Sequence, residues 1–426
     1  MLSDQAQEAA PERIEATAPR WNGFDRNWMI SLFGTAIGAG ILFLPINAGA
    51  GGVWPLLVVS LMVAPMTYLA HRSLSRMICH SRRPGDDITV VAKDFFGEGF
   101  GKLVTVLYFF AIYPIVLIYG IGITNTVDSL IVNQFHQPSP PRAVLSFILI
   151  AAMMGVMVAG QRIMLIVTGW LVYPLIAVLF GVTVYLIPSW KLDFFTADVP
   201  SAGSLAKSIW LMIPVMVFAF NHSPAISQFS LAMKQEYGQH APDKASQVLK
   251  RTTVLLVVFA MGFVWSCVLA LGVDGLAEAR KTNLPVLSYL ANVNGAPFIS
   301  YLGPVVAITA IASSFFGHYL GAAEGLAGIV RFADPDARKI SNPLLTKAIA
   351  GFMFLTTWLA AVVNPSILSM IEQLSGPIIA MVLFLLPMWA IHRVPVLQRY
   401  RGRASNVFVV VAGLLAVSAV VSGFLA

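Results

Sequence analysis

Charged residues are scarce in this chain. Aspartate, glutamate, lysine and arginine make up 11% of it, whereas about 25% is usual in soluble domains. They are missing altogether from long apolar stretches such as 29–70. Apolar runs of this length recur from one end of the chain to the other. They exclude an ordinary soluble domain and indicate an all-α integral membrane protein with many spans.

Cysteine is also rare, since Cys79 and Cys267 are the only two. Two thiols provide no disulfide framework, and nothing around them suggests a metal site. The chain contains no CxxC, HExxH or GxxxxGK motif. Gly38-Ala39-Gly40 does not open a dinucleotide-binding fingerprint either, because Phe43 stands where that pattern needs its third glycine. We therefore expect no cofactor and no covalent chemistry.

Hydropathy, with prolines and glycines at the joints, predicts eleven transmembrane helices. Their ranges are 28–50, 53–71, 103–130, 143–160, 163–187, 208–233, 251–272, 301–330, 345–363, 366–391 and 406–425. With a cytoplasmic N-terminus, all 27 Lys and Arg residues fall on the cytoplasmic side except Arg142, Lys191, Lys207, Arg280 and Lys281. This asymmetry follows the positive-inside rule. The net charge of +7 then belongs to a face that meets anionic lipid, and we expect no nucleic-acid partner.

The spans divide the chain into four segments. Residues 1–27 are largely polar, lack the apolar core of a signal peptide, and are expected to form a disordered cytoplasmic tail. Residues 28–187 and 188–391 form two halves of five helices each. Residues 392–426 add a cytoplasmic loop and the eleventh helix. Because an offset of five spans reverses the direction of crossing, the first helices of the two halves run in opposite senses, as in inverted repeats.

Both of these corresponding helices contain residues that disfavour a continuous helix. The first carries three glycines within GTAIGAGILFLPI (34–46), and each glycine costs about 1 kcal/mol relative to alanine in a helix interior. The sixth span carries VFAFNHSPAISQF (217–229), where Pro224 removes a backbone donor and clashes with the preceding turn. Two interrupted helices at one depth are the best pointer in a sequence to the binding site of a transporter.

An unwound segment exposes the ends of two half-helices in the middle of the membrane. Free N–H groups and the positive end of a helix dipole can hold a substrate carboxylate. Free carbonyl groups at the opposing end can hold a cation or an ammonium group. A zwitterionic amino acid needs both. The alternative for Gly34-x-x-x-Gly38 is close helix packing through small residues.

The eighth span carries hydroxyl and ionisable side chains. Ser313 and Ser314 lie near its midpoint, and His318 follows one turn later on the same face as Ser314. Ionisable groups within a membrane are candidates for function, and the ordinary pKa of histidine, about 6.5, suits a proton relay. We therefore take Ser313, Ser314, His318 and Glu324 as candidate ion-coupling residues. The alternatives are a neutral histidine bonded to a carbonyl and an interfacial Glu324 near Arg331.

Other features predict contacts outside these spans. The third span offers Tyr113, Tyr119, Thr124 and Asn125. A tyrosine hydroxyl in the middle of the membrane would bond a substrate carboxylate, with simple packing as an equal alternative, and Tyr113 is the candidate substrate contact. Residues 85–99 predict a short cytoplasmic helix with Asp86 as its N-cap and Gly97 as its stop. Residues 282–295 predict a short outer helix that starts near Asn283, and it either packs on the surface or covers an entrance.

Five long segments follow one another in a fixed order: GTAIGAGILFLPINAG, YFFAIYPI, IPVMVFAFNHSPAIS, GHYLGAAEG and NPSILSMIEQLSGPIIAMVLFLLPM. They resemble the bacterial hydroxy/aromatic amino acid permeases, in particular the serine and threonine transporters, from about Trp28 to the C-terminus. The resemblance implies a LeuT-type fold, a 5+5 inverted repeat plus one extra helix. It also implies symport of an amino acid with a cation, usually a proton, across the bacterial inner membrane.

The resemblance further implies substrate contacts from the interrupted parts of spans 1 and 6. In this chain these residues are Thr35, Ala36, Gly38, Ala39, Gly40, Phe220, Asn221, His222 and Ser223. For His222, bracing of the local helix is an equal alternative. A break with few bulky side chains suits a small polar amino acid, L-serine or also L-threonine, better than tryptophan.

Ser313 departs from what the resemblance implies, because the proton-coupled serine and threonine members carry a lysine at this position. A lysine ammonium there would take the place of a metal ion by changing its charge. Two serine oxygens together with carbonyl groups of span 1 would instead form a site of hard oxygen ligands, which suits Na⁺. The coupling ion therefore stays open between H⁺, through His318 or Glu324, and Na⁺ at Ser313 and Ser314.

These observations predict a secondary active transporter of the bacterial inner membrane that imports serine with a cation by alternating access. An aromatic amino acid permease of the same family is the alternative. A channel would need a continuous polar stripe, which the nearly uncharged spans do not supply. An intramembrane hydrolase would need a paired nucleophile and base, and the adjacent His222 and Ser223 diverge by about 100° on a helix. The oligomeric state is left open.

Overall fold

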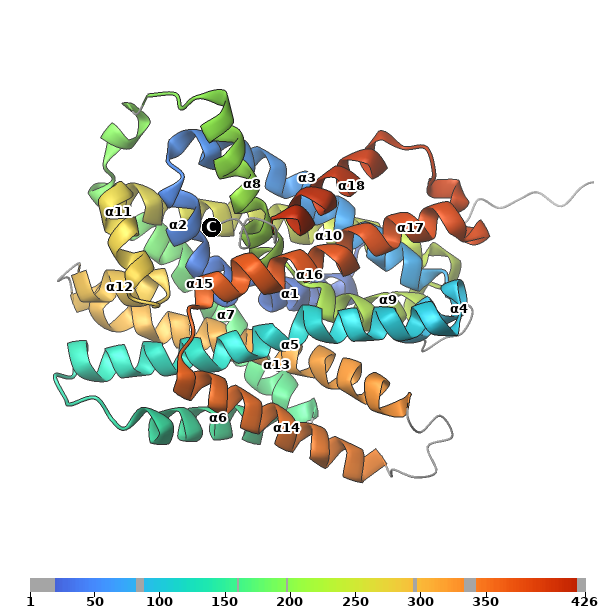
Figure 1. Ribbon diagram of the computed structural model, residues 1–426, viewed down its shortest axis with the longest axis horizontal. Coiled ribbons are helices and arrows are strands. Elements are labelled where there is room, and N and C mark those ends of the chain that lie inside the picture. The colour runs from blue at the N-terminus through green and yellow to red at the C-terminus, as the bar shows by residue number, and fades with distance from the viewer. Residues whose placement is uncertain are drawn as a thin grey trace, which may run out of the picture.

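A computed structural model describes residues 20–81, 88–158, 161–196, 198–293, 297–332 and 342–419. Within these ranges the regular elements are helices, and none is a strand. The longer helices run side by side along the longest axis of the molecule (Figure 1). The expected all-α architecture is therefore confirmed.

The first half of the chain opens with two helices separated by a short break, α1 (Gly23–Ala36) and α2 (Ala39–Ala50). It continues with α3 (Val53–Cys79), α4 (Ile88–Phe96), α5 (Glu98–Ser129), the π-helical turn η1 (Leu130–Gln134), α6 (Arg142–Val158) and α7 (Gln161–Tyr185). The 3₁₀ turns η2 (Ile187–Ser189) and η3 (Leu192–Thr196) lead to the second half.

The second half also opens with two helices separated by a short break, α8 (Ala202–Ala219) and α9 (Ser223–Tyr237). Next come η4 (Gly238–His240), α10 (Ala241–Leu256), η5 (Val257–Met261), α11 (Gly262–Lys281), α12 (Val286–Val293), α13 (Pro297–Arg331) and α14 (Asn342–Val363). The chain ends with α15 (Ile367–Met370), η6 (Ile371–Ser375), α16 (Gly376–Ala380), η7 (Met381–Leu385), α17 (Leu386–Arg393), η8 (Pro395–Tyr400) and α18 (Ala404–Ser418).

The described residues contain eight helical segments long and apolar enough to cross a membrane, or nine if the bent pair α1–α2 counts as one span. Two shorter apolar helices, α6 and α18, lie where the fourth and eleventh spans are predicted. Every predicted span therefore overlaps a helix. The total of eleven, the side of the N-terminus and the segment boundaries stay predictions.

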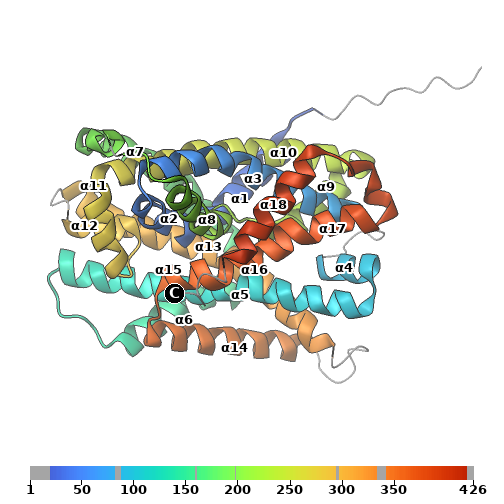
Figure 2. The same ribbon diagram turned by 45° about the horizontal axis from the view of Figure 1, so that its top comes forward.

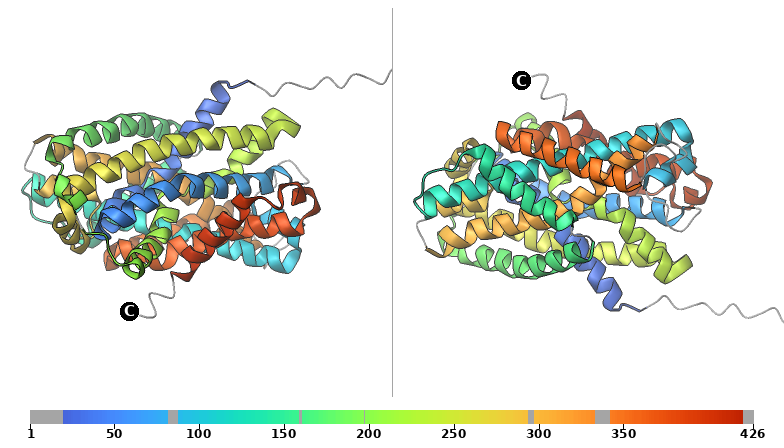
Figure 3. Two further views of the ribbon diagram at one scale, coloured as in Figure 1. Left: turned by 90° about the horizontal axis from the view of Figure 1, so that it is seen from above. Right: turned by 90° about the horizontal axis from the view of Figure 1, so that it is seen from below.

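The helices form two groups around the broken helix α1–α2. Figures 1 and 2 show α5, α6, α13 and α14 on one side, where α5 runs alongside α13, and α3, α8 and α10 on the other. α1 contacts α10 and α13, while α2 contacts α8 and α11. Two further views show the long helices running the length of the bundle (Figure 3). The broken helix is thus in contact with both groups.

The helix of the first span starts at Gly23, earlier than the predicted residue 28. Asn22 and Asp25 form a capping box, in which each side chain accepts the backbone N–H of the other at 3.1 Å. Asp25 also lies 2.6 Å from the Nζ of Lys244 on α10 and accepts the hydroxyl of Tyr237 at 2.8 Å. A buried ion pair therefore fastens the first turn of α1 to α10.

The two predicted short helices are present as α4 and α12. α4 ends before Gly97, whose φ of +87° is a conformation that glycine adopts at little cost. The expected N-cap Asp86 lies outside the described residues. α12 follows Asn283, whose Oδ1 accepts the N–H of Ile367 at 2.9 Å and so ties this loop to the start of α15.

Candidate functional site

The first predicted interruption lies between α1 and α2. The chain leaves helical geometry at Ile37 and Gly38, and the two helices are bent by 55°. The N–H of Ile37 still bonds the carbonyl of Phe33 at 3.0 Å, whereas the first N–H groups of α2 have no acceptor within their own helix. Gly38, Ala39 and Gly40 are buried. The break therefore presents a set of backbone donors inside the protein.

The second predicted interruption lies between α8 and α9. Phe220, Asn221 and His222 separate the two helices. The Oδ1 of Asn221 accepts the N–H of Ser223 at 3.0 Å, and Pro224 fits the first turn of α9 because no donor is needed there. Within the described residues, the buried Nδ2 of Asn221 has no hydrogen-bond partner. It is an additional donor in the break.

The two breaks adjoin each other. A Cβ atom at Gly40 would lie 2.7 Å from the Cα of Ala219, the last residue of α8. A Cβ atom at Gly38 would lie 2.5 Å from the Oγ of Ser314 and 2.8 Å from the hydroxyl of Tyr119. Glycine is required at both positions because other atoms already occupy the space of a side chain. The alternative of close packing through Gly34 and Gly38 agrees with these contacts, since a Cβ atom at Gly34 would lie 2.6 Å from the Cγ2 of Val172 on α7. Gly38 is closely packed at the break itself.

Ser314 on α13 reaches the carbonyl groups at the end of α1. Its Oγ lies 3.0 Å from the carbonyl oxygen of Thr35 and 3.1 Å from that of Ile37. Ser313 instead donates to the carbonyl of Ala310 in its own helix, at 3.1 Å. Of the two serines predicted to face span 1, only Ser314 bonds its carbonyl groups here. Its hydroxyl and two carbonyl oxygens converge from two helices.

His318 lies one turn further along α13 and is 2% exposed. Its Nδ1 is 2.9 Å from the carbonyl oxygen of Ser314, as the alternative of a carbonyl-bonded histidine predicts. Its ring stands edge-on to that of Tyr119, with the centroids 5.3 Å apart. Glu324 is half-buried further along the same helix. His318 is therefore adjacent to the breaks through Ser314 and Tyr119.

The other predicted substrate residues differ in their positions. Tyr113 stacks on Phe109 at 4.8 Å and on Phe352 of α14 at 5.7 Å, so its ring is directed towards α14. Tyr119, further along α5, is the tyrosine whose hydroxyl lies at Gly38. The candidates whose backbone borders the two breaks are Thr35, Ala36, Ala39, Phe220 and Ser223.

His222 contacts a histidine that is not among the site residues predicted from the sequence. Its ring stacks on that of His71 in α3, with centroids 3.5 Å apart and planes 5° apart. The backbone N–H of His222 donates to the Nε2 of His71 at 3.1 Å. One feature of the sequence could have indicated His71. It directly follows the charge-free run 29–70, so it places an ionisable ring at the end of an apolar span.

Polar contacts also connect the elements near the other end of α2. Glu372 in η6 accepts the Nδ2 of Asn47 at 2.7 Å and the guanidinium of Arg280 at 2.9 Å. These three side chains join α2, α11 and η6. The ion pair between Asp25 and Lys244 lies at the opposite end of the broken helix, at the start of α1. Side chains therefore link neighbouring elements on both sides of the breaks.

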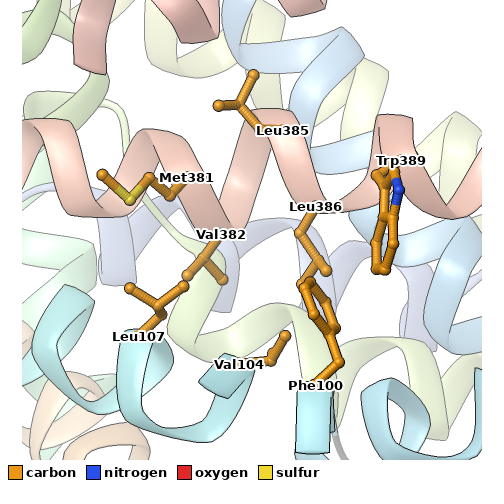
Figure 4. A pocket seen from close by; sticks show the side chains of 8 residues that line it. All are labelled: Phe100, Val104, Leu107, Met381, Val382, Leu385, Leu386 and Trp389. Carbon is orange, nitrogen blue, oxygen red and sulfur yellow. The ribbon is translucent and has the colours of Figure 1, made fainter. Parts of the chain in front are cut away.

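A cavity of about 160 Å³ lies elsewhere, between α5 and the run from η7 to α17 (Figure 4). Apolar and aromatic side chains from these two elements face one another across it: Phe100, Val104, Leu107, Met381, Val382, Leu385, Leu386 and Trp389. They offer no charged group or hydroxyl to a carboxylate or an ammonium, and burying such groups without partners is costly. The candidate site for a zwitterion therefore stays at the breaks.

Residues 28–425 match the model of the tryptophan/tyrosine permease family. The chain is 49% identical over 406 residues to the serine transporter SdaC of Escherichia coli (strain K12), which covers 94% of this chain and 95% of that protein. It is 41% identical over 423 residues to the threonine/serine transporter TdcC of Escherichia fergusonii, with 94% and 96% covered.

Two solved structures are similar in fold. MhsT in complex with L-phenylalanine matches with a TM-score of 0.56 and 16% identity, over 93% of this chain and 97% of that one. A variant of the manganese transporter of Eremococcus coleocola matches with a TM-score of 0.64 and 13% identity, over 95% and 88%. These likenesses support the LeuT-type architecture. The chain belongs to the tryptophan/tyrosine permease family, as a multi-pass transporter of the bacterial inner membrane and not an enzyme.

Proposed function

We propose that this protein imports L-serine together with a cation by alternating access. The observation that carries the proposal is the contact between the two breaks, where α2 begins against the end of α8. The N-terminal N–H groups of α2 and α9 are suited to a carboxylate, and the carbonyl groups ending α1 are suited to an ammonium group. Relatives named as serine and threonine/serine transporters support serine first and threonine second.

The close packing at the breaks favours a small substrate. Gly38 and Gly40 leave no room for a side chain of their own, and Phe220 is 2% exposed in the second break. The name of the family supports an aromatic substrate as the alternative. An excess of unlabelled L-tryptophan or L-tyrosine should therefore leave the uptake of labelled L-serine unchanged, whereas unlabelled L-threonine should compete. Strong competition by tryptophan would favour the alternative.

The coupling ion in this proposal is the proton. The hydroxyl of Ser314 already bonds the two carbonyl oxygens at the end of α1. In this arrangement Ser314 directs its one O–H at these oxygens, whereas binding of a metal ion would require its lone pairs. The buried His318, next to Ser314, belongs to the one residue type whose ordinary charge change lies between pH 5 and 8. Glu324, half-buried on the same helix, is the second candidate for a proton-carrying side chain.

Na⁺ is the second candidate for the coupling ion, and one arrangement favours it. The Oγ of Ser314 and the carbonyl oxygens of Thr35 and Ile37 converge from α13 and α1. Oxygen atoms are the ligands that hard cations prefer. A serine hydroxyl can turn its hydrogen away and present its lone pairs instead.

Uptake of labelled serine into proteoliposomes tests the proposal, with the two gradients imposed separately. An inward proton gradient in sodium-free buffer should drive accumulation of serine above its external concentration, and a protonophore should abolish that accumulation. Accumulation under a sodium gradient alone, at equal pH on both sides, would assign the coupling to Na⁺. Equilibration without accumulation under either gradient would contradict symport.

A further inference from the structure

Two buried imidazoles face each other at the break between α8 and α9. The rings of His71 and His222 are parallel within 5°, with their centroids 3.5 Å apart. The two residues are 2% and 0% exposed. His71 belongs to α3, and His222 directly precedes α9. The stacked pair therefore links the second break to a neighbouring helix of the bundle.

The hydrogen bonds of His71 define its protonation. Its Nε2 accepts the backbone N–H of His222 at 3.1 Å, and because a backbone N–H can only donate, this nitrogen carries no proton. Its Nδ1 lies 2.8 Å from the carbonyl oxygen of Thr67, which can only accept, so Nδ1 carries the proton. His71 is therefore a neutral imidazole, and both of its nitrogens are engaged.

His222 differs from His71 in one nitrogen. Its Nδ1 lies 3.1 Å from the carbonyl oxygen of Phe220 and therefore carries a proton. Its Nε2 is buried and, within the described residues, has no hydrogen-bond partner. Leaving a buried polar atom without a partner is unfavourable. This nitrogen is the one basic atom of the pair that can take a proton without breaking a hydrogen bond.

The surroundings of the pair are apolar, and the described residues place no carboxylate against either ring. A cavity of about 10 Å³, close to the space that one water molecule needs, borders His71 and Phe220 among apolar neighbours. Several ionisable groups on the helices packed against the pair have partners elsewhere: Arg72 on Tyr68, Arg76 on Tyr400, Cys79 on Ser230, Lys234 on Ser81, Lys244 on Asp25, Arg251 on Trp21 and His392 on Arg401. Of the others on these helices, Lys207, Glu236, Asp243, Lys250 and Arg393 are exposed, and Glu324 on α13, which packs against α9, is half-buried. Within the described residues, a charge on the pair would therefore have no carboxylate in direct contact with it.

We propose that the stacked pair His71–His222 is the binding site of the coupling proton, and that the proton binds at the Nε2 of His222. This proposal rests on the proposed proton-coupled uptake of serine, and it assigns the proton to His222 in place of the candidates His318 and Glu324. The pair stays neutral while the breaks are empty, because an isolated buried charge is costly. Binding of a serine carboxylate at the neighbouring helix N-termini supplies the missing negative charge. Serine and proton therefore bind cooperatively, and each raises the affinity for the other by the same factor.

His71 supports the bound proton in two ways. Its ring face lies against the imidazolium that forms on His222, where the π-electrons of an aromatic ring attract a cation. Its Nε2 holds the backbone of the break through the N–H of His222. After serine has dissociated, the proton would dissociate from the Nε2 of His222. The cycle therefore forms and breaks only this one N–H bond.

The experiment measures protons taken up per serine bound by the purified protein in weakly buffered, sodium-free detergent solution at saturating serine. The unmodified protein should take up about one proton per serine, and His222→Gln should take up close to none. His136→Gln, which changes an exposed loop histidine, is the matched control and should behave like the unmodified protein. Equal proton uptake by His222→Gln would overturn the proposal.

If His222→Gln binds no serine, its proton uptake cannot be measured, and a second variant then tests the proposal. His71→Gln keeps an acceptor for the N–H of His222 but removes the stacked ring. Half-maximal proton uptake should then need a proton concentration about tenfold higher, and an unchanged midpoint would overturn the proposal. If the unmodified protein binds serine without taking up any proton, the proton coupling itself fails. That outcome differs from the one that contradicts only the role of His71 and His222. In the latter case the unmodified protein takes up a proton with serine, and the histidine variants do so equally well.

Discussion

Replacing Lys244 with methionine isolates the role of the buried ion pair at the start of α1. The Nζ of Lys244 lies 2.6 Å from the Oδ2 of Asp25, and the two side chains are 4% and 0% exposed. Methionine keeps most of the length and the apolar contacts of lysine but removes the ammonium group. The Asp25 carboxylate then stays buried with two neutral donors, the N–H of Asn22 and the hydroxyl of Tyr237.

The size of the effect follows from burial. Removing one partner of a buried ion pair costs about 3–5 kcal/mol, because the remaining charge is uncompensated. An exposed pair contributes little, because water and salt screen its charges. Lys281 and Glu278 form such a pair at 2.8 Å, with side chains 72% and 58% exposed. We therefore expect Lys244→Met to lower the free energy of unfolding by about 3–5 kcal/mol, and Lys281→Met to lower it far less, because its ammonium group is exposed to water.

Equilibrium unfolding in mixed micelles, followed by the circular dichroism of the helices, measures both variants. The double variant Asp25→Asn with Lys244→Met removes both charges and keeps the capping side chain, so it should recover most of the lost stability. The expected role of the ion pair is refuted if Lys244→Met is no less stable than Lys281→Met. It is also refuted if the double variant is as unstable as Lys244→Met alone.

The Ser314→Ala variant should bind labelled serine about five- to tenfold more weakly and Ser313→Ala less so, because only the Ser314 hydroxyl bonds the end of α1. Equal losses in the two variants would contradict the assignment of the Ser314 contact. At the other end of α2, Glu372→Gln should slow serine uptake by about two- to fivefold, because it loses the charge that pairs with Arg280. The exposed Glu278→Gln should transport at the unmodified rate, and equal rates of both variants would argue against a role for Glu372.

The sequence was sufficient for the position of both breaks, because the signals for them are local. Glycine and proline act on their own turn of the chain, so Gly38 and Pro224 could be located without knowing any neighbour. Their contact was inferred from the inverted-repeat pattern, and the packing of Gly40 against Ala219 agrees with it. Hydropathy also predicted which parts of the chain are helical. It did not predict helix ends that a capping residue determines, such as the start of α1 after Asn22.

Contacts between distant helices were not predictable. A span that is apolar on all sides has no polar stripe to define which face turns inwards. The choice between Tyr113 and Tyr119 depended on this rotation, and only Tyr119 reaches Gly38. The stacking of His222 on His71 depends in the same way on how α3 packs against α8 and α9. The pairing of Lys244 with Asp25 required α10 to lie against α1.

The central claim is that serine binds where the two breaks meet. Equilibrium binding of labelled serine to purified Gly38→Ala and Gly351→Ala tests it most directly. A Cβ atom at Gly38 would overlap Ser314 and Tyr119, whereas one at Gly351 on α14 meets nothing within 4 Å. The account predicts that Gly38→Ala stays folded and binds serine about tenfold or more weakly, while Gly351→Ala binds like the unmodified protein. Unchanged serine affinity in folded Gly38→Ala would contradict the claim.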